Sequence, residues 1–276
     1  MPEPKNLIID ITSAHQPGMV YVMLSRVCSM EQLHILDKLD IEKITVNEKV
    51  LAEASRMEKV SVNKNPSRWM NPETKGLKIC SFNTRSLRKH MEDVRSDPVL
   101  MQSHVLCLQE TWLKVEEEKD EQYQLEGFRA CFASVGHGKG LAVFVKEGIK
   151  YESMTCIPEA NIQIMKITMA KLDIITVYRS DSEPEYRAAH HLSQLIDPEK
   201  DTLVVGDLNY CDKMEKKDLS RFLAREGFTQ LVTVPTHIRG GVLDHAHLRR
   251  TVSKPKVEVK TFSHYYTDHD SVTCVL

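Results

Sequence analysis

Leu203-Val204-Val205-Gly206-Asp207-Leu208-Asn209 is the stretch around which the chain is organised. Its run of leucine and valine predicts a short buried strand, and the glycine allows the end of that strand to turn sharply. We therefore expect Asp207 and Asn209 to project together from the rim of a sheet. The ends of strands are a common place for catalytic groups in sheet proteins.

Four other apolar runs border polar residues in the same way. Three predicted strands lead into Asn83, Glu110 and Tyr178, and a fourth directly follows Asp268 and His269. Taken singly these residues carry little weight, because Asp and Asn at strand ends are commonly turn formers. If the strands converge, one rim carries a whole polar set: Asn83, Glu110, Tyr178, Asp207, Asn209, Asp268 and His269.

The polar set lies within five short blocks that follow one another in a fixed order. These blocks are Ser81-Phe82-Asn83, Leu108-Gln109-Glu110-Thr111, Gly206-Asp207-Leu208-Asn209, Pro235-Thr236-His237 followed by Leu243-Asp244-His245, and Thr267-Asp268-His269-Asp270. Their order, from about Gly76 to Leu276, resembles the endonuclease/exonuclease/phosphatase superfamily, which includes the endonucleases of LINE-type retrotransposons. Two departures are mild: Leu208 stands where the family often has Phe, and Ser271 where Pro is usual.

The resemblance implies an α/β fold, a four-layer α/β/β/α sandwich in which two mixed sheets pack face to face between helices. The residues fit this class, since predicted strands and helices mix without strict βαβ alternation. We expect surface helices at 86–94, 185–195 and 216–226, and strands at 141–146 and 162–169.

Carboxylates gathered at one rim repel each other unless a cation lies between them, and oxygen ligands favour Mg²⁺ or Mn²⁺ over zinc. Glu110 is the first metal-ligand candidate, with Asp268 and Asn83 beside it. The spacing of His and Cys residues does not suggest a zinc site.

Phosphodiester hydrolysis needs an activated water, stabilisation of charge on the phosphoryl oxygens and help for the leaving alkoxide. Asp207 suits activation of the water, steadied by Asn209, and His269 can donate to a phosphoryl oxygen. The resemblance implies that Asp244 orients His269 and that Tyr178 contacts the phosphate or the leaving group.

The remaining histidines have simpler interpretations. His237 and His245 adjoin the family blocks and are expected to support loops rather than to catalyse. His190, His191 and His247 show no pattern of partners, so we assign them no role in the site.

Residues 1–59 differ in character from the rest. Their run at 18–27 resembles the last conserved motif of superfamily 1 DNA helicases, with Arg26 placed like the arginine that reaches the ATP γ-phosphate. The chain has no Gly-x-x-x-x-Gly-Lys-Ser/Thr cradle, so we expect a helicase remnant that binds no ATP. Residues 60–75, with two Asn-Pro pairs, predict an extended linker to a nuclease domain at 76–276. A helicase followed by such an endonuclease resembles some Helitron-type transposon proteins, and a gene-model accident is the alternative.

Composition bounds the class of protein. The 276 residues allow one large domain or a domain with an appendage, and 41% hydrophobic with 28% charged residues is ordinary for a globular protein. No apolar run approaches the roughly 20 residues that span a bilayer, and the N-terminus lacks the core of a signal peptide. We therefore expect an intracellular protein without a membrane partner, with the nucleus as a candidate location.

The seven cysteines form no Cys-x-x-Cys pair. Cys80, Cys107 and Cys274 lie within predicted strands, so we expect buried apolar fillers in a reducing compartment. A net charge of −2 does not by itself indicate nucleic-acid binding, although local patches can bind DNA on a neutral protein.

These observations favour a divalent-metal-dependent phosphodiester hydrolase, most simply a DNA endonuclease of transposable-element origin. The retroelement-like block Asn83-Thr84-Arg85-Ser86-Leu87 and the helicase-like leader favour DNA as the partner. Two alternatives stay open: a phosphatase or phosphodiesterase acting on a small-molecule or lipid phosphate, and a catalytically inactive DNA-binding module. The sequence leaves the oligomeric state open.

Overall fold

The computed structural model divides into two compact units, Met1–Pro66 and Ser67–Leu276. The residues that it describes are 7–9, 33–36, 76–136, 138–210, 218–252 and 257–276. In the first unit, β1 (Leu7–Ile9) pairs in parallel with β2 (Leu33–Ile35). Arg26 and the linker expected at 60–75 lie outside the described residues.

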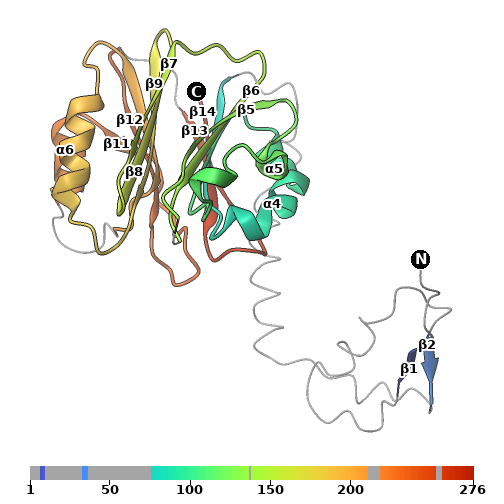
Figure 1. The fold of residues 1–276 in the computed structure, drawn as a ribbon. Coiled ribbons are helices and arrows are strands. Elements are labelled where there is room, and N and C mark those ends of the chain that lie inside the picture. Colours follow the sequence, from blue (N-terminus) through green and yellow to red (C-terminus); the bar gives the residue numbers. More distant parts are fainter. Residues whose placement is uncertain (1–6, 10–32, 37–75, 137, 211–217, 253–256) are drawn as a thin grey trace. The chain divides into compact units, whose positions relative to one another are not determined.

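Two six-stranded mixed sheets form the second unit (Figure 1). In spatial order, the first sheet contains β11 (Thr229–Gln230), β12 (Asp244–Arg249), β10 (Asp201–Asp207), β9 (Leu172–Arg179), β8 (Ile162–Thr168) and β7 (Ser153–Pro158). The second sheet contains β13 (Glu258–Ser263), β14 (Asp270–Val275), β3 (Lys78–Asn83), β4 (Val105–Gln109), β6 (Leu141–Lys146) and β5 (Phe128–Ala133).

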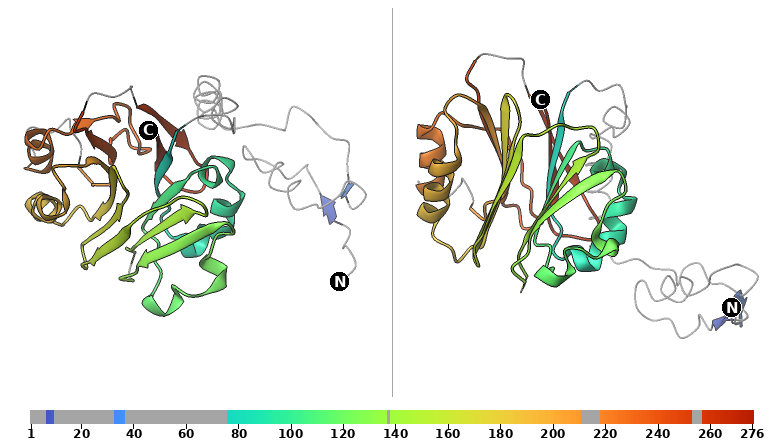
Figure 2. Two further views of the ribbon diagram at one scale, coloured as in Figure 1. Left: turned by 90° about the horizontal axis from the view of Figure 1, so that it is seen from above. Right: turned by 45° about the horizontal axis from the view of Figure 1, so that its top comes forward.

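Helices cover the outer face of each sheet (Figure 2). Those on the first sheet are α6 (Glu185–Leu195) and α7 (Asp218–Arg225), and those on the second are α4 (Leu87–Ser96) and α5 (Pro98–Met101). Two short 3₁₀ turns, η3 (Val115–Glu117) and η4 (Glu121–Tyr123), lie between β4 and β5. The predicted four-layer α/β/β/α sandwich is confirmed. Among the described helices, none is long and apolar enough to cross a membrane.

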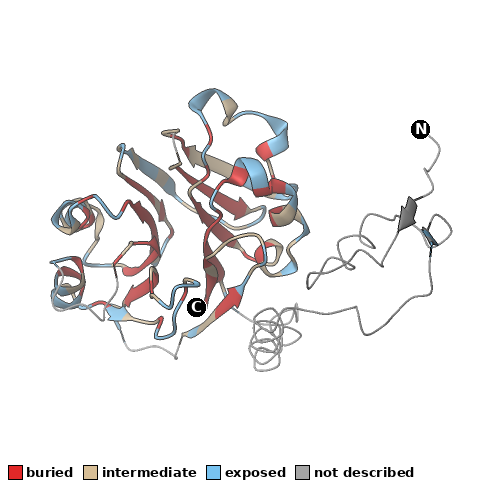
Figure 3. Cartoon of the chain, turned by 90° about the horizontal axis from the view of Figure 1, so that it is seen from below, coloured by how far each residue is buried: buried red, intermediate tan, exposed pale blue. Residues whose placement is uncertain are grey.

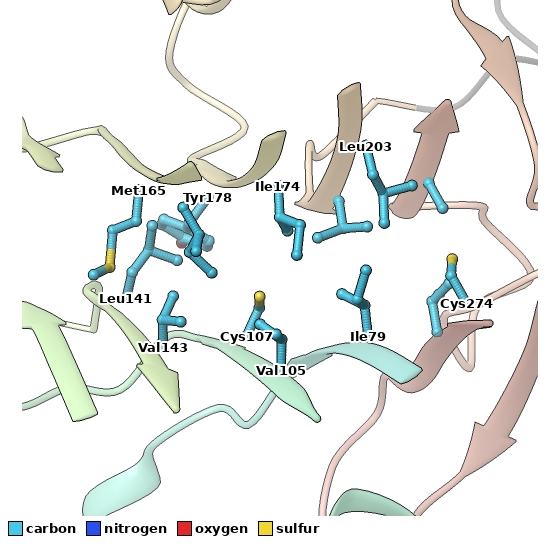
Figure 4. Packing of buried hydrophobic residues seen from close by; sticks show 14 of the residues in the cluster. Ile79, Val105, Cys107, Leu141, Val143, Met165, Ile174, Tyr178, Leu203 and Cys274 are labelled. Atoms are coloured by element: carbon cyan, nitrogen blue, oxygen red, sulfur yellow. The ribbon is translucent and has the colours of Figure 1, made fainter. Parts of the chain in front are cut away.

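The strands are apolar almost without interruption because both of their faces are covered. In β10, Leu203 and Val205 belong to the cluster between the sheets, whereas Val204 packs with residues of α6 and α7. Successive side chains in a strand point to opposite faces, so each strand supplies two layers of core. Figure 4 shows side chains of the two sheets, among them Ile79 and Leu203, pointing toward one another. Figure 3 shows buried strands between helices with exposed outer faces.

The expected cysteine burial is confirmed, since Cys80, Cys107 and Cys274 are all fully buried in the described fold. Burial raises the pKa of the Cys80 thiol to about 11, which keeps it protonated. These thiols therefore act as apolar fillers.

Gly206 is required by a close approach between strands. Its φ is +138°, and a Cβ added there would lie 1.9 Å from the carbonyl oxygen of Val177 on β9. Only glycine combines this backbone conformation with that approach. The sharp turn expected at Gly206 is therefore a local distortion, because β10 continues through Asp207.

Candidate active site

The polar residues meet at one edge of the two sheets because of the direction of the strands. β3 runs parallel to β4 and β9 runs parallel to β10, and the hydrogen bond between Asn83 and Asp207 shows that both pairs end at the same edge. β12 and β14 run antiparallel to their neighbours, so they begin at that edge. Residues near the ends of the first four strands thus meet residues near the starts of the last two.

Asn83 bridges the two sheets at this edge. Its Nδ2 donates to Glu110 Oε1 at 2.9 Å and to Asp207 Oδ2 at 2.8 Å, and its Oδ1 accepts from the backbone N–H of Arg85 at 3.0 Å. Asn83 is fully buried. One amide therefore holds a carboxylate from each sheet.

Asp207 is held by the residues that follow β10. Asn209 donates to it twice, from the backbone N to Oδ1 at 3.0 Å and from Nδ2 to Oδ2 at 3.3 Å. Asn209 adopts a φ of +49°, and the buried guanidinium of Arg179 fixes this loop by donating to the carbonyls of Leu208 and Asn209, both at 2.8 Å. The predicted joint projection of Asp207 and Asn209 is confirmed.

Burial and the charge of Asp244 raise the pKa of Asp207 to about 8. The neighbouring His269 and the amide of Asn83 act in the opposite direction. A positive charge near this carboxylate therefore decides whether it is ionised at neutral pH.

His269 forms a buried pair with Asp244. Its Nδ1 lies 2.9 Å from Asp244 Oδ2, which directs Nε2 toward the side of Asp268. Burial alone would lower the pKa of His269, but the carboxylate of Asp244 outweighs it and raises the pKa to about 9. The imidazole is protonated at neutral pH, so Nε2 carries a hydrogen that it can donate.

Asp268 receives two cationic or donor groups on one oxygen. Its Oδ2 forms an ion pair with the guanidinium of Arg85 and lies 3.3 Å from His237 Nε2. Burial alone would raise the pKa of Asp268, but the charges of His269 and Arg85 have the larger effect. The pKa of Asp268 therefore lies below its ordinary value. The other oxygen, Oδ1, is buried and has no hydrogen-bond partner among the described residues.

Glu110 follows β4 directly and adopts a φ of +52°. Its Oε1 accepts from Asn83, and its Oε2 accepts from Trp112 Nε1 at 3.2 Å. Burial raises the pKa of Tyr178, and the charges of Glu110 and Asp207 raise it further, so this phenol stays protonated beside Glu110. Figure 4 shows the Tyr178 side chain in the space between the two sheets.

The residues offer suitable ligands for a hard divalent cation. The buried oxygens Asp268 Oδ1 and Asp244 Oδ1 lack hydrogen-bond partners among the described residues, and a buried carboxylate oxygen without a partner is costly. Two groups of close potential ligand atoms occur in the described part of the chain, Asp207, Asp244 and His269, and His237, Asp268 and His269, but the protonated His269 cannot itself ligate a cation. Glu110 belongs to neither group. The oxygen-rich donor set fits Mg²⁺ or Mn²⁺.

The structure brings together all eight residues predicted for the site, which are Asn83, Glu110, Tyr178, Asp207, Asn209, Asp244, Asp268 and His269. His245, expected as a loop support, contacts the backbone carbonyl of Tyr210 at 2.9 Å. His247 and His191 bond Tyr210 and Glu159, away from this network.

Sequence reasoning missed four residues of the network: Arg85, Trp112, His237 and Thr267. His237 does support its loop, since Nδ1 accepts from the backbone N–H of Arg239 at 3.1 Å, but its Nε2 also reaches Asp268. Thr267 Oγ1 donates to the carbonyl of Asn83 at 3.1 Å. Only their place within or beside the quoted blocks could have indicated them.

A family model described as Endonuclease/Exonuclease/phosphatase family matches residues 80–269. This range contains every side chain of the network, from Asn83 to His269. No curated protein matches the chain.

Several solved structures share the fold. A 3′ phosphatase (NExo) from Neisseria bound to a product DNA hairpin has a TM-score of 0.58 and 16% identity over 72% of this chain and 98% of that chain. An AP endonuclease from Archaeoglobus fulgidus has a TM-score of 0.55 and 17% identity over 72% and 98%. The endonuclease domain of TRAS1, a telomere-specific non-LTR retrotransposon, has a TM-score of 0.54 and 14% identity over 72% and 97%. At these identities the likeness shows the fold alone.

Proposed function

Because the chain belongs to the Endonuclease/Exonuclease/phosphatase family, whose members are hydrolases of phosphodiester bonds, we propose that it is a divalent-metal-dependent DNA endonuclease of transposable-element origin. One observation carries the proposal. A carboxylate held by amides, Asp207, and a protonated imidazole, His269, lie within one cluster at the edge of the sheets. Such a pair supplies a proton acceptor and a hydrogen-bond donor to one phosphate.

Asp207 is the proposed proton acceptor for the attacking water. Asn83 and Asn209 donate to its oxygens, so the carboxylate is fixed while it keeps lone pairs for a water hydrogen. A carboxylate with a raised pKa takes a proton more readily than an ordinary one. The nearby cationic His269 favours its ionised form in the resting site.

His269 is the proposed donor to the phosphoryl oxygen on which negative charge develops. Asp244 occupies Nδ1 and holds the ring in place, so Nε2–H is the atom that faces the substrate. A fixed donor of this kind costs no reorganisation during the reaction. Tyr178, protonated and close to Glu110, is the proposed contact to the phosphate or the leaving oxygen.

Glu110, Asn83 and Asp268 are the proposed ligands of the cation, with Mg²⁺ or Mn²⁺ as the ion. The Oδ1 of Asp268, which has no hydrogen-bond partner among the described residues, and the carboxylate of Glu110 beside Asn83 support this assignment. When bound, the cation supplies charge stabilisation for the phosphoryl oxygens and the leaving alkoxide. Arg85 and His237 already compensate Asp268 on its other oxygen.

DNA is the proposed partner, and residues 76–276 are the proposed catalytic domain. The retroelement-like block that contains Arg85 supports DNA, as does the fold shared with a retrotransposon endonuclease domain. Residues 1–59 are proposed to be a helicase remnant without ATP binding, joined by a linker at 60–75. An intracellular, nuclear location stays a prediction from the sequence.

Nicking of supercoiled plasmid by the full chain tests the proposal. We expect nicking with Mg²⁺ or Mn²⁺ and none with EDTA. Asp207→Asn should abolish nicking, whereas Asp218→Asn, the same change on an exposed residue of α7, should leave it intact. Faster turnover of a lipid or small-molecule phosphate than of DNA would instead favour the phosphatase alternative. DNA binding without turnover of any ester would indicate an inactive module.

A further inference from the structure

Trp112 combines exposure to solvent with an unusual backbone conformation. The residue is 39% exposed although it adjoins a buried polar network, and its φ is +58°. A bulky residue in this left-handed region is an outlier, and Glu110, two residues earlier, is in the same region. Strained residues of this kind persist where the surrounding structure fixes them, and they cluster at functional sites.

The surroundings of Trp112 hold its ring in one position. Its backbone N–H donates to the carbonyl of Lys139 at 2.9 Å, and Nε1 donates to Glu110 Oε2 at 3.2 Å. A Cβ added to Gly138 would lie 3.6 Å from the indole, so that glycine stands beside the ring. The indole is thus anchored at one edge to a proposed metal ligand, while a substantial part of its surface faces solvent.

We propose that Trp112 is a stacking platform for a nucleobase beside the scissile phosphate, an inference that rests on the proposed function. An exposed aromatic ring fixed next to the residues that hold a phosphodiester can contact a base of the same strand. Stacking on an aromatic side chain is tolerant of sequence, because every base has a π face. A phosphate ester without an aromatic group cannot use this contact, so Trp112 selects nucleic acid over non-aromatic phosphate esters.

Kinetics on two substrates test the selection. Trp112→Leu should raise KM for an oligonucleotide roughly 5- to 150-fold, the range that corresponds to loss of one base stack. The loss of kcat/KM for DNA should exceed that for an abasic oligonucleotide of equal length, which has no π face, at least fivefold. The hydrogen bond from Trp112 to Glu110 is absent from the variant whichever substrate is used. The difference between the two losses of kcat/KM therefore measures stacking alone.

Two further variants separate stacking from other roles. Trp112→Phe keeps an aromatic face without the Nε1–H, so it should recover most of the DNA preference and also shows whether the position tolerates change. Tyr186→Leu removes another exposed aromatic residue, 61% exposed on α6, and should leave both substrates unchanged. Equal losses on both substrates in Trp112→Leu would overturn the proposal and leave Trp112 as an orienting residue for Glu110.

Fluorescence provides a readout that does not depend on turnover. The chain has two tryptophans, at 69 and 112, so Trp69→Phe leaves Trp112 as the reporter. In that variant with Asp207→Asn and EDTA, a single-stranded oligonucleotide should quench the emission, whereas an abasic oligomer of equal length should quench much less. Equal quenching, or none, would refute stacking. Quenching in this variant, together with no cleavage of DNA by the wild-type chain in Mg²⁺ or Mn²⁺, would refute the proposed function alone.

Discussion

Replacing Asn83 by aspartate tests whether one neutral amide keeps two carboxylates together. Nδ2 of Asn83 lies 2.9 Å from Glu110 Oε1 and 2.8 Å from Asp207 Oδ2. In Asn83→Asp a carboxylate oxygen takes the place of that donor. The side chain stays almost the same size, so the change is one of charge and hydrogen bonding in a fully buried position.

The expected loss of stability follows from these distances. Two unit charges 2.9 Å apart repel by about 6 kcal/mol at an effective dielectric constant of about 20. Holding a proton on a carboxyl group with an ordinary pKa of about 3.9 costs about 5 kcal/mol at pH 7.5 and about 1.5 kcal/mol at pH 5. Protonation is the smaller cost, so the folded variant should retain a proton. Its raised pKa in the folded state means that stability falls as pH rises above 3.9.

Urea denaturation in EDTA at pH 5 and pH 7.5 measures this effect. The difference in unfolding free energy between wild type and Asn83→Asp should grow by about 3 to 4 kcal/mol between the two pH values. Asn161→Asp is the matched control, because Asn161 Oδ1 accepts from Lys139 Nζ at 2.5 Å and a carboxylate there faces a cation. That control should lose less than about 1 kcal/mol at either pH.

A loss of stability in Asn83→Asp that does not change with pH would refute the electrostatic reasoning. It would mean that the cost arises from the lost hydrogen bonds alone. Added Mg²⁺ should restore part of the stability at pH 7.5, because a cation can separate the carboxylates.

The remaining predictions concern the metal, the strand geometry, pH and the leader. Glu110→Ala should abolish metal-dependent cleavage without unfolding the protein; unchanged Mg²⁺ affinity in calorimetry would reassign this residue. Gly206→Ala should lower the unfolding free energy by more than about 3 kcal/mol, whereas Gly148→Ala, which meets no atom within 4 Å, should cost about 1 kcal/mol. Burial lowers the pKa of His247 to about 3, so the unfolded state binds more protons than the folded state below pH 6.5. The contribution of His247 to the unfolding free energy should therefore fall by about 1.4 kcal/mol per pH unit as pH falls from 6.5. The variant His247→Gln should lack this contribution. A chain starting at Gly76 should nick plasmid at the full saturating rate, and ATP hydrolysis by the full chain that truncation removes would contradict the remnant interpretation.

The sequence determined the class of fold and the identity of most polar residues at the rim. Apolar runs such as Leu203–Val205 predict buried strands because burial on both faces leaves no polar positions. The residue that ends each run can also be read directly, as with Asp207 at the end of β10. The order of the blocks then added Asp244, which no local pattern identifies, and the family resemblance supplied the role of Tyr178.

Only the tertiary structure decided how these residues act on one another. The bridge from Asn83 to Asp207 joins residues 124 positions apart, and the contact of His237 with Asp268 depends on how two loops meet. Burial and the carboxylate of Asp244 set the pKa of His269, and the fold sets which groups donate to Glu110. A local sequence pattern encodes neither of these properties. Local sequence sets which groups a strand end presents, whereas charge, burial and partners arise from packing between distant segments.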